Sequence, residues 1–216
     1  SHVYHISYEH IKDICNFDLS VLNNELSKVK WKSVWGKDGV SRASAWFTAN
    51  KCTCPYVYSG QAWPALPFED WMTSLAIILK DGLGLHGTPD AVNLNRYINK
   101  KCSLGFHADD ESIFKQDDGC RTIVSLSVGA TRPFWLKKKY DTESNALEVI
   151  LKSGDICVMQ GKTQSFWQHK IPRDNTPTNA HDDQCRYNLT FRFITRHSAK
   201  CKTWQVGGIG EVETIN

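Results

Sequence analysis

A histidine and an aspartate lie two residues apart in the stretch Phe106-His107-Ala108-Asp109. If this stretch is a strand, both side chains project from the same face, because side chains alternate between the two faces. An imidazole nitrogen and a carboxylate oxygen are two of the three ligands in the two-histidine, one-carboxylate site of non-haem Fe(II). Such a pair also occurs by chance, so the prediction of iron depends on a second histidine.

His169 is the best candidate for that second histidine. It lies in the stretch QSFWQHKIPR, where the neighbouring apolar residues predict a strand. Other histidines are less suited: His2, His5 and His10 lie near the N-terminus, His181 in a polar loop and His197 after the last predicted strand. Because a histidine in a strand can also be an ordinary core residue, His169 needs further support as a ligand.

The stretch CRYNLTFRF, residues 185–193, supplies that support. On a strand, Arg186, Asn188, Thr190 and Arg192 share one face, and the apolar and aromatic residues share the other. The simplest interpretation is that the polar face meets water. The iron site suggests another: three protein ligands leave three positions for a bidentate 2-oxo acid and O2. The distal carboxylate of such an acid needs a bidentate, permanently charged partner, which arginine provides.

The sequence predicts a mainly β scaffold for these residues. Residues 18–28 and 68–80 are typical of helices, the second with Pro67 at its start and Gly82 and Gly84 at its end. Short strands are predicted at 91–98, 103–107, 122–128, 132–138, 146–151, 155–159, 165–171 and 186–195. Their number favours an α+β, mainly β fold, a jelly roll with helices packed from the N-terminal third.

No repeat or linker divides the chain, so we expect one domain over residues 1–216. Within it we expect a helical N-terminal part at about 1–90, a jelly-roll core at 91–195 and a C-terminal tail at 196–216. Hydrophobic residues make up 41% and charged residues 23%, as in an ordinary soluble protein. The longest apolar runs are too short to span a membrane, and no signal peptide is recognised. We therefore expect an intracellular protein, nuclear or cytoplasmic.

The eight cysteines favour buried, reduced thiols over disulfides, because several lie in apolar runs, such as Cys157 in DICVM. A structural zinc at Cys52 and Cys54 is the lesser alternative, since no second pair lies at ligand spacing. The net charge of +3 is modest, but lysines cluster at 28–37, 100–101 and 137–139. These clusters either attract phosphates or form ordinary solvated faces.

At this point the chain resembles the AlkB-like Fe(II)/2-oxoglutarate-dependent nucleic-acid dealkylases. The matching motifs are N-R-Y at 95–97, H-A-D-D-E at 107–111, S-L-S-V-G-A-T-R at 125–132, S-G-D-I-C-V-M-Q-G at 153–161, W-Q-H-K-I-P at 167–172 and R-Y-N-L-T-F-R at 186–192. They fall in the family's order over about residues 40–195. R-Y-N-L-T-F-R together with H-x-D-D-E is highly specific for this family, far more so than a lone H-x-D.

The resemblance implies a double-stranded β-helix that holds Fe(II) through His107, Asp109 and His169, with 2-oxoglutarate and O2 as cosubstrates. It assigns the 2-oxoglutarate contacts to Asn95, Tyr97, Arg186, Asn188 and Arg192. Arg186 is expected to grip the distal carboxylate. Arg192 is expected near the metal end of the cosubstrate or near the substrate.

Residues 41–47 and 55–60 resemble the family's nucleotide-recognition segment. Tyr58, or Trp46, is expected to stack on an extruded base, with the His107 ring on the other side. Tyr56 is a candidate for a phosphate contact and Arg42 for a contact to the base or backbone. Core packing is the alternative for the aromatic residues. An insert at 48–54 departs from the family's compact spacing and puts Trp46 in doubt.

Asp110 and Glu111 follow the metal ligand directly and are expected to border the pocket. Carboxylates there favour a cationic base. The expected function is thus oxidative demethylation of 1-methyladenine or 3-methylcytosine in DNA or RNA, by a monomer that prefers single strands. Formaldehyde, succinate and CO2 are the products. The alternatives are an N6-methyladenine RNA demethylase, a same-fold oxygenase acting on proteins or small molecules, and a nucleic-acid-binding module without catalysis.

Overall fold

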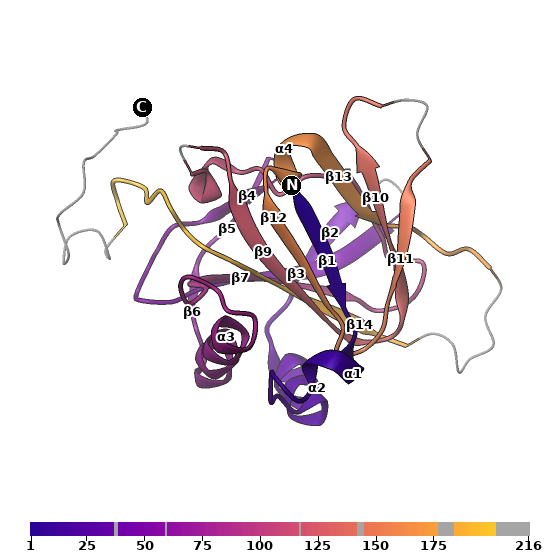
Figure 1. The fold of residues 1–216 in the computed structure, drawn as a ribbon, viewed down its shortest axis with the longest axis horizontal. Coiled ribbons are helices and arrows are strands. Elements are labelled where there is room, and N and C mark those ends of the chain that lie inside the picture. Colours follow the sequence, from indigo (N-terminus) through magenta and orange to yellow (C-terminus); the bar gives the residue numbers. More distant parts are fainter. Residues whose placement is uncertain (37–38, 59, 117, 142–144, 177–183, 202–216) are drawn as a thin grey trace.

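The computed structural model describes residues 1–36, 39–58, 60–116, 118–141, 145–176 and 184–201, and its core contains two antiparallel sheets (Figure 1). The larger sheet contains, in spatial order, β1 (His2–Ile6), β12 (Ile156–Gly161), β9 (Arg121–Gly129), β14 (Arg186–Arg192), β7 (Ala91–Tyr97), β3 (Gly39–Thr48) and β2 (Lys32–Gly36). A short β6 (Leu66–Pro67) pairs with β3. The smaller sheet contains β11 (Leu147–Leu151), β10 (Arg132–Lys138), β13 (Trp167–Ile171) and β8 (Leu104–His107).

Helices cover the outer face of the larger sheet (Figure 1). They are α1 (Tyr8–Ile11), α2 (Leu19–Lys28) and α3 (Asp70–Gly82). The carboxylate of Asp18 caps α2 by accepting hydrogen bonds from the backbone N–H groups of Ser20 and Val21. Apolar side chains of α2 and α3, such as Leu26 and Leu79, pack in one buried cluster with the outward-facing residues of β3, β7, β9 and β14.

The other face of the larger sheet faces the smaller sheet. Strand β14 is central, paired with β7 on one side and β9 on the other. Its side chains Tyr187, Leu189 and Phe191 belong to the cluster beneath the helices. Its polar side chains therefore point between the sheets, so the interpretation that they meet water is wrong. The mainly β jelly-roll fold with packed helices is confirmed.

The N-terminal third contains more strand than expected. Among the described residues, six strands precede residue 90, including the hairpin of β4 (Tyr56–Tyr58) and β5 (Gln61–Trp63), where the sequence predicted strands only beyond residue 90. The N-terminal residues pair as β1 with β12, and His5 Nε2 lies 2.9 Å from Asp155 Oδ2. Such pairing between distant segments leaves no mark on local periodicity.

Several element boundaries also differ from the sequence prediction. The helix predicted at 68–80 begins at Asp70, because Pro67 is already paired in β6. The strand predicted at 165–171 begins at Trp167, after the single-turn helix α4 (Thr163–Phe166). β14 ends at Arg192, and a short 3-10 helix, η1 (Ser112–Phe114), follows β8. His181 and residues 202–216 of the expected tail lie outside the described residues.

None of the helices in the described ranges has the length and apolarity needed to cross a membrane.

Candidate active site

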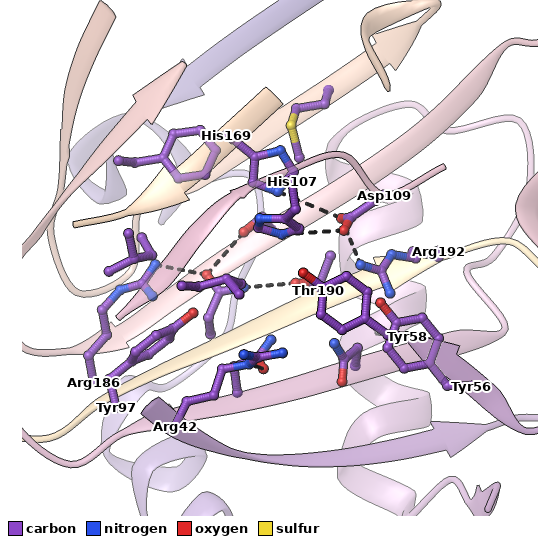
Figure 2. Close-up of a pocket in the computed structure, with 18 residues that line it drawn as sticks. Arg42, Tyr56, Tyr58, Tyr97, His107, Asp109, His169, Arg186, Thr190 and Arg192 are labelled. Carbon is purple, nitrogen blue, oxygen red and sulfur yellow. Dashed lines mark hydrogen bonds and ion pairs between the residues drawn. The ribbon is translucent and has the colours of Figure 1, made fainter. Parts of the chain in front are cut away.

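His107 and His169 lie side by side on neighbouring strands of the smaller sheet (Figure 2). β8 and β13 pair with these two residues directly opposite, and their ring centroids are 4.2 Å apart. Asp109 follows β8, and its carboxylate oxygens lie 3.7 Å from His107 Nε2 and 4.0 Å from His169 Nε2. One ligand atom from each residue therefore lies within 4.8 Å of the other two. The structure brings together the three predicted iron ligands.

Hydrogen bonds orient two of these three residues. His107 Nδ1 lies 2.9 Å from the carbonyl oxygen of Gly105. Because a carbonyl can only accept, Nδ1 carries the proton and Nε2 keeps its lone pair for a metal. The backbone N–H of Asp109 donates to Gln164 Oε1 at 2.9 Å. Gln164 is buried on α4, so this single helical turn positions the segment that carries Asp109.

The protonation states of the three residues suit a metal. Burial lowers the pKa of His107, and burial together with the neighbouring imidazole lowers the pKa of His169 to about 3. Burial alone raises the pKa of Asp109, but the Arg192 guanidinium and both imidazoles bring it well below its usual range. At neutral pH the site thus offers two neutral imidazoles and one carboxylate. This donor set fits the two-histidine, one-carboxylate coordination of Fe(II).

Arg186 is a buried cation that lines the same pocket as the three predicted iron ligands. It is 1% exposed, and its Nη2 donates to Ser127 Oγ at 2.9 Å and to Asn188 Oδ1 at 2.8 Å. Nε and Nη1 have no hydrogen-bond partner among the described residues. Burial lowers the pKa of Arg186 to about 10, so the group remains charged at neutral pH. Since a buried charge is costly without a partner, these two nitrogens suit a carboxylate.

One pocket joins the metal ligands to Arg186 (Figure 2). About 510 Å³ of empty space lies inside it, a volume that includes open solvent at its mouth. The register of β14 with β7 places Arg186 opposite Tyr97 and Asn188 opposite Asn95, so these residues share one face. All five residues expected to contact 2-oxoglutarate line the pocket: Asn95, Tyr97, Arg186, Asn188 and Arg192.

Arg42 and Tyr58 form another part of the pocket wall. Arg42 Nε donates to Asn95 Oδ1 at 2.9 Å, and its Cζ lies 5.6 Å from the centre of the Tyr58 ring. The rings of Tyr58 and His107 are 5.9 Å apart and 73° from parallel. A base held between two rings needs about 7 Å of separation. The predicted sandwich of a base between Tyr58 and His107 therefore does not fit this arrangement unless Tyr58 moves.

Trp46 and Tyr56 pack in the core behind this wall. Trp46 is 1% exposed, donates from Nε1 to the Cys54 carbonyl at 3.0 Å and stacks on Tyr56 at 5.1 Å. Tyr56 lines the pocket with its ring, but it is 4% exposed and its hydroxyl donates to Glu111 Oε1 at 2.7 Å. The predictions of base stacking by Trp46 and of a phosphate contact by Tyr56 do not fit these positions. The insert before Tyr56 covers Trp46 here, because its Cys54 carbonyl accepts the Trp46 hydrogen bond.

Asp110 and Glu111 lie outside the pocket lining. The Asp110 carboxylate turns to the surface and pairs with Lys139 Nζ at 2.8 Å. Glu111 is largely buried behind Tyr56, and burial raises its pKa. Neither carboxylate forms the border that we expected for a cationic base.

Several lining or supporting residues were not singled out from the sequence. Ser125 and Ser127 of β9 face the pocket side, and their spacing of two in S-L-S was a usable signal of a shared face. Asn93 and Phe134 also line the pocket, and the Phe134 ring stacks on His169 at 5.3 Å. Gln164 left no such signal, because its role depends on the position of α4.

Comparisons with known proteins agree with this geometry. A model of the 2OG-Fe(II) oxygenase superfamily matches residues 26–192. Two proteins named alpha-ketoglutarate-dependent dioxygenase alkB homolog 3 are similar, with 33% identity over 186 residues in Bos taurus and 30% over 183 residues in Homo sapiens. Each match covers 81% of this chain but only 61% and 60% of those proteins. The chain thus spans about three fifths of the length of these relatives.

A DNA oxidative demethylase of Arabidopsis thaliana, ALKBH2, is 28% identical over 183 residues, which cover 74% of this chain and 56% of that protein. Among solved structures, that of OsALKBH1 superimposes with a TM-score of 0.57 at 20% identity. The superposition covers 88% of this chain and 97% of that one, so the two share a fold.

Proposed function

The chain belongs to the 2OG-Fe(II) oxygenase superfamily, as an AlkB-like member, and we propose that it oxidatively demethylates N-alkylated bases in nucleic acid. One observation carries the proposal: a buried pair of imidazoles and a carboxylate share a pocket with the unpartnered nitrogens of Arg186. The first group suits Fe(II) and the second suits a dicarboxylate cosubstrate. The names of the alkB homolog 3 proteins support the 2-oxoglutarate-dependent dioxygenase chemistry, and the name of the Arabidopsis DNA oxidative demethylase supports the proposed substrate class.

The chain's own residues would hold and orient the reactants. Bound Fe(II) supplies the oxidative chemistry that couples decarboxylation of 2-oxoglutarate to hydroxylation of the methyl group. Arg186 would bind the distal carboxylate through Nε and Nη1, with Asn188 and Ser127 fixing the guanidinium from the other side. Arg192 keeps Asp109 ionised and oriented. The hydroxymethyl group formed on the base would then leave as formaldehyde.

The substrate class is inferred from the pocket mouth and from the charge around it. Tyr58 lies at the mouth beside Arg42, where a base extruded from its strand would find an aromatic face. Lys137 and Lys138 end β10, the strand paired with the His169-bearing β13, and the next lysine, Lys139, is paired with Asp110. Such a run next to the site suits the phosphates of a nucleic acid. We further propose single strands as the preferred substrate.

Mass spectrometry of modified oligonucleotides tests this proposal. DNA and RNA oligomers carrying 1-methyladenine, 3-methylcytosine or N6-methyladenine are incubated with Fe(II) and 2-oxoglutarate, both single-stranded and annealed. We expect loss of the methyl group from 1-methyladenine or 3-methylcytosine in single strands, with one succinate formed for each methyl group lost. His107→Ala should abolish the reaction. Cosubstrate turnover that is stimulated by peptides but not by any oligomer would instead identify a protein-directed oxygenase of the same fold.

A further inference from the structure

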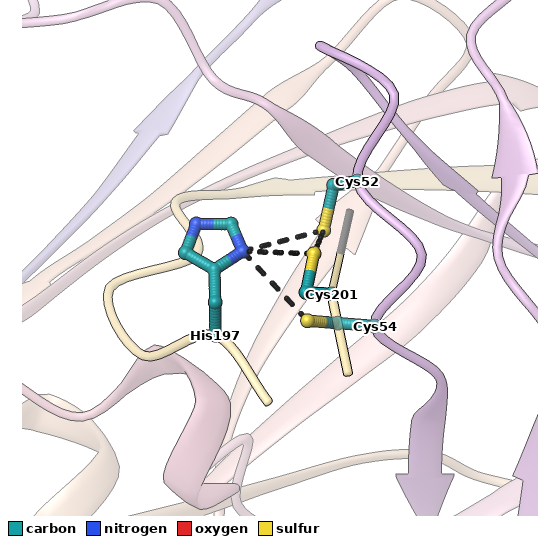
Figure 3. A group of neighbouring side chains, drawn as sticks. All are labelled: Cys52, Cys54, His197 and Cys201. Atoms are coloured by element: carbon teal, nitrogen blue, oxygen red, sulfur yellow. Dashed lines mark hydrogen bonds between the residues drawn. The ribbon is translucent and has the colours of Figure 1, made fainter. Parts of the chain in front are cut away.

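Four side chains far apart in the sequence converge in one group, next to the Cys54 carbonyl that accepts the hydrogen bond from Trp46 (Figure 3). Cys52 and Cys54 lie between β3 and β4, and His197 and Cys201 follow β14. Nδ1 of His197 lies 3.5 Å from Cys52 Sγ, 3.7 Å from Cys54 Sγ and 3.5 Å from Cys201 Sγ. The sulfurs of Cys52 and Cys201 are 3.6 Å apart. One nitrogen thus sits at nearly equal distances from three sulfurs.

These separations match a tetrahedral zinc site. Zn²⁺ bound at about 2.3 Å to sulfur and about 2.0 Å to nitrogen sets two sulfur ligands about 3.8 Å apart. The same bond lengths set a sulfur and a nitrogen ligand about 3.5 Å apart. The three sulfur–nitrogen distances and the sulfur–sulfur distance fall within a few tenths of an ångström of these values. A disulfide does not explain them, because a bonded pair of sulfurs is about 2.05 Å apart.

The surroundings of the four side chains also favour a metal. The three cysteines are buried, at 7%, 2% and 0% exposure. Backbone N–H groups donate to two of the sulfurs, from Thr53 to Cys201 Sγ at 3.4 Å and from Ser198 to Cys54 Sγ at 3.3 Å. Hydrogen bonds of this kind stabilise thiolates and commonly surround metal-bound sulfur. Thiols that merely packed in the core would have no need of them.

We propose that Cys52, Cys54, His197 and Cys201 bind one Zn²⁺ in a closed structural site. Four protein ligands complete a tetrahedron and leave no position for a substrate, which separates this site from the three-residue iron site. On binding, the three thiols become thiolates and release their protons to solvent. From the sequence, zinc at Cys52 and Cys54 was only the lesser alternative, because the H-x-x-x-C pair at 197 and 201 lies far away along the chain.

The proposed zinc would tie the segment after β14 to the wall of the active-site pocket. The insert that carries Cys52 and Cys54 turns at Asn50 and Lys51, both with left-handed backbone angles (φ 53° and 57°). The carbonyl of Cys54 receives the hydrogen bond from Trp46, against which Tyr56 stacks. Tyr58 follows two residues beyond Tyr56 and lines the pocket. The metal would therefore position the β4–β5 hairpin that carries the proposed substrate contact.

Metal analysis of the intact chain tests the proposal without relying on activity. Because zinc can also occupy the iron site, the test uses a His107→Ala/His169→Ala background, which keeps the Asp109–Arg192 ion pair, grown in zinc-supplemented medium. We expect about one zinc per chain by elemental analysis and by native mass spectrometry. Adding Cys54→Ser or His197→Ala should reduce zinc to a small fraction of this. The matched control Cys15→Ser changes a buried cysteine outside the group and should keep the zinc.

Cobalt provides a second measurement in case the cysteine variants fail to fold. Co²⁺ is added to the chelator-treated double variant, which retains all four proposed ligands. A tetrahedral thiolate site gives intense visible d–d bands and a sulfur-to-cobalt charge-transfer band, and Zn²⁺ should abolish both. Absence of zinc together with absence of these bands would overturn the proposal. So would a mass lower by two hydrogens, which indicates a disulfide, or full zinc retention by a folded Cys54→Ser variant.

Discussion

Arg192 and Asp109 form a buried ion pair inside the candidate iron site, with Arg192 Nη2 2.7 Å from Asp109 Oδ2. Both residues are almost fully buried, at 2% and 3% exposure. Burial alone lowers the pKa of Arg192, but the Asp109 carboxylate raises it above its usual range. The last residue of β14 thereby holds the carboxylate that follows β8. Iron binding and the stability of the metal-free fold should both depend on this pair.

Asp109→Asn should remove iron binding and also destabilise the metal-free protein. The substitution leaves the Arg192 guanidinium buried beside a neutral amide, and breaking a buried pair in this way typically costs about 3–5 kcal/mol. Urea unfolding in the presence of a chelator measures the free energy of unfolding, and elemental analysis measures the iron.

The double variant Asp109→Asn/Arg192→Met separates these two effects. It removes the unpaired charge, so we expect it to recover most of the lost free energy of unfolding while iron binding stays absent. If the single variant were as stable as the parent, the ion pair would have no structural role.

Arg186→Lys should weaken 2-oxoglutarate binding by about ten- to a hundredfold, because one charged hydrogen bond is worth about 1.5–3 kcal/mol. Lysine keeps the charge but cannot offer two parallel N–H groups to a carboxylate. Calorimetric titration with Mn²⁺ in place of iron measures the affinity without turnover.

Arg132→Lys is the matched control for this prediction. Arg132 is equally buried, but its guanidinium donates to the carbonyls of Asn99, Cys102 and Pro172 and does not line the pocket. We expect this variant to lose stability and to keep its affinity for 2-oxoglutarate. Equal loss of affinity in both variants would remove the special role of Arg186.

Local alternation predicted the part of the site that lies within single strands. The spacing of Arg186, Asn188 and Arg192 placed them on one face, and the structure confirms that they line the pocket. The convergence of His169 on His107 was also expected, but its cause is the antiparallel register of β13 with β8. Interactions across strands or loops were missed, as with the Gln164 contact to the Asp109 backbone. Such contacts are set by tertiary packing, which a one-dimensional pattern does not encode.

Trp46 tests the distinction between core packing and base recognition. Trp46→Ala should lower the free energy of unfolding by about 3–5 kcal/mol, as is typical for truncating a buried aromatic residue. Trp46→Phe should lower the free energy of unfolding by less, because it keeps most of the stacking on Tyr56. It still loses the hydrogen bond to the Cys54 carbonyl. Denaturant unfolding measures both variants. A Trp46→Ala protein of unchanged stability that no longer binds oligonucleotide would show that Trp46 contacts the base.

Tyr58→Ala should raise KM for a methylated oligonucleotide by about five- to a hundredfold, since stacking on one base is worth about 1–3 kcal/mol. Tyr58→Phe keeps the aromatic face and should stay close to the parent. Neither variant should change KM for 2-oxoglutarate, because that cosubstrate is expected at the Arg186 end of the pocket.

Tyr4→Ala, which removes an exposed ring from the edge strand β1, is the control for a nonspecific loss of aromatic surface. Steady-state kinetics with the oligomer and then with 2-oxoglutarate as the varied substrate measure both constants. Equal losses in the alanine and phenylalanine variants would assign the effect to the hydroxyl and exclude stacking as its cause.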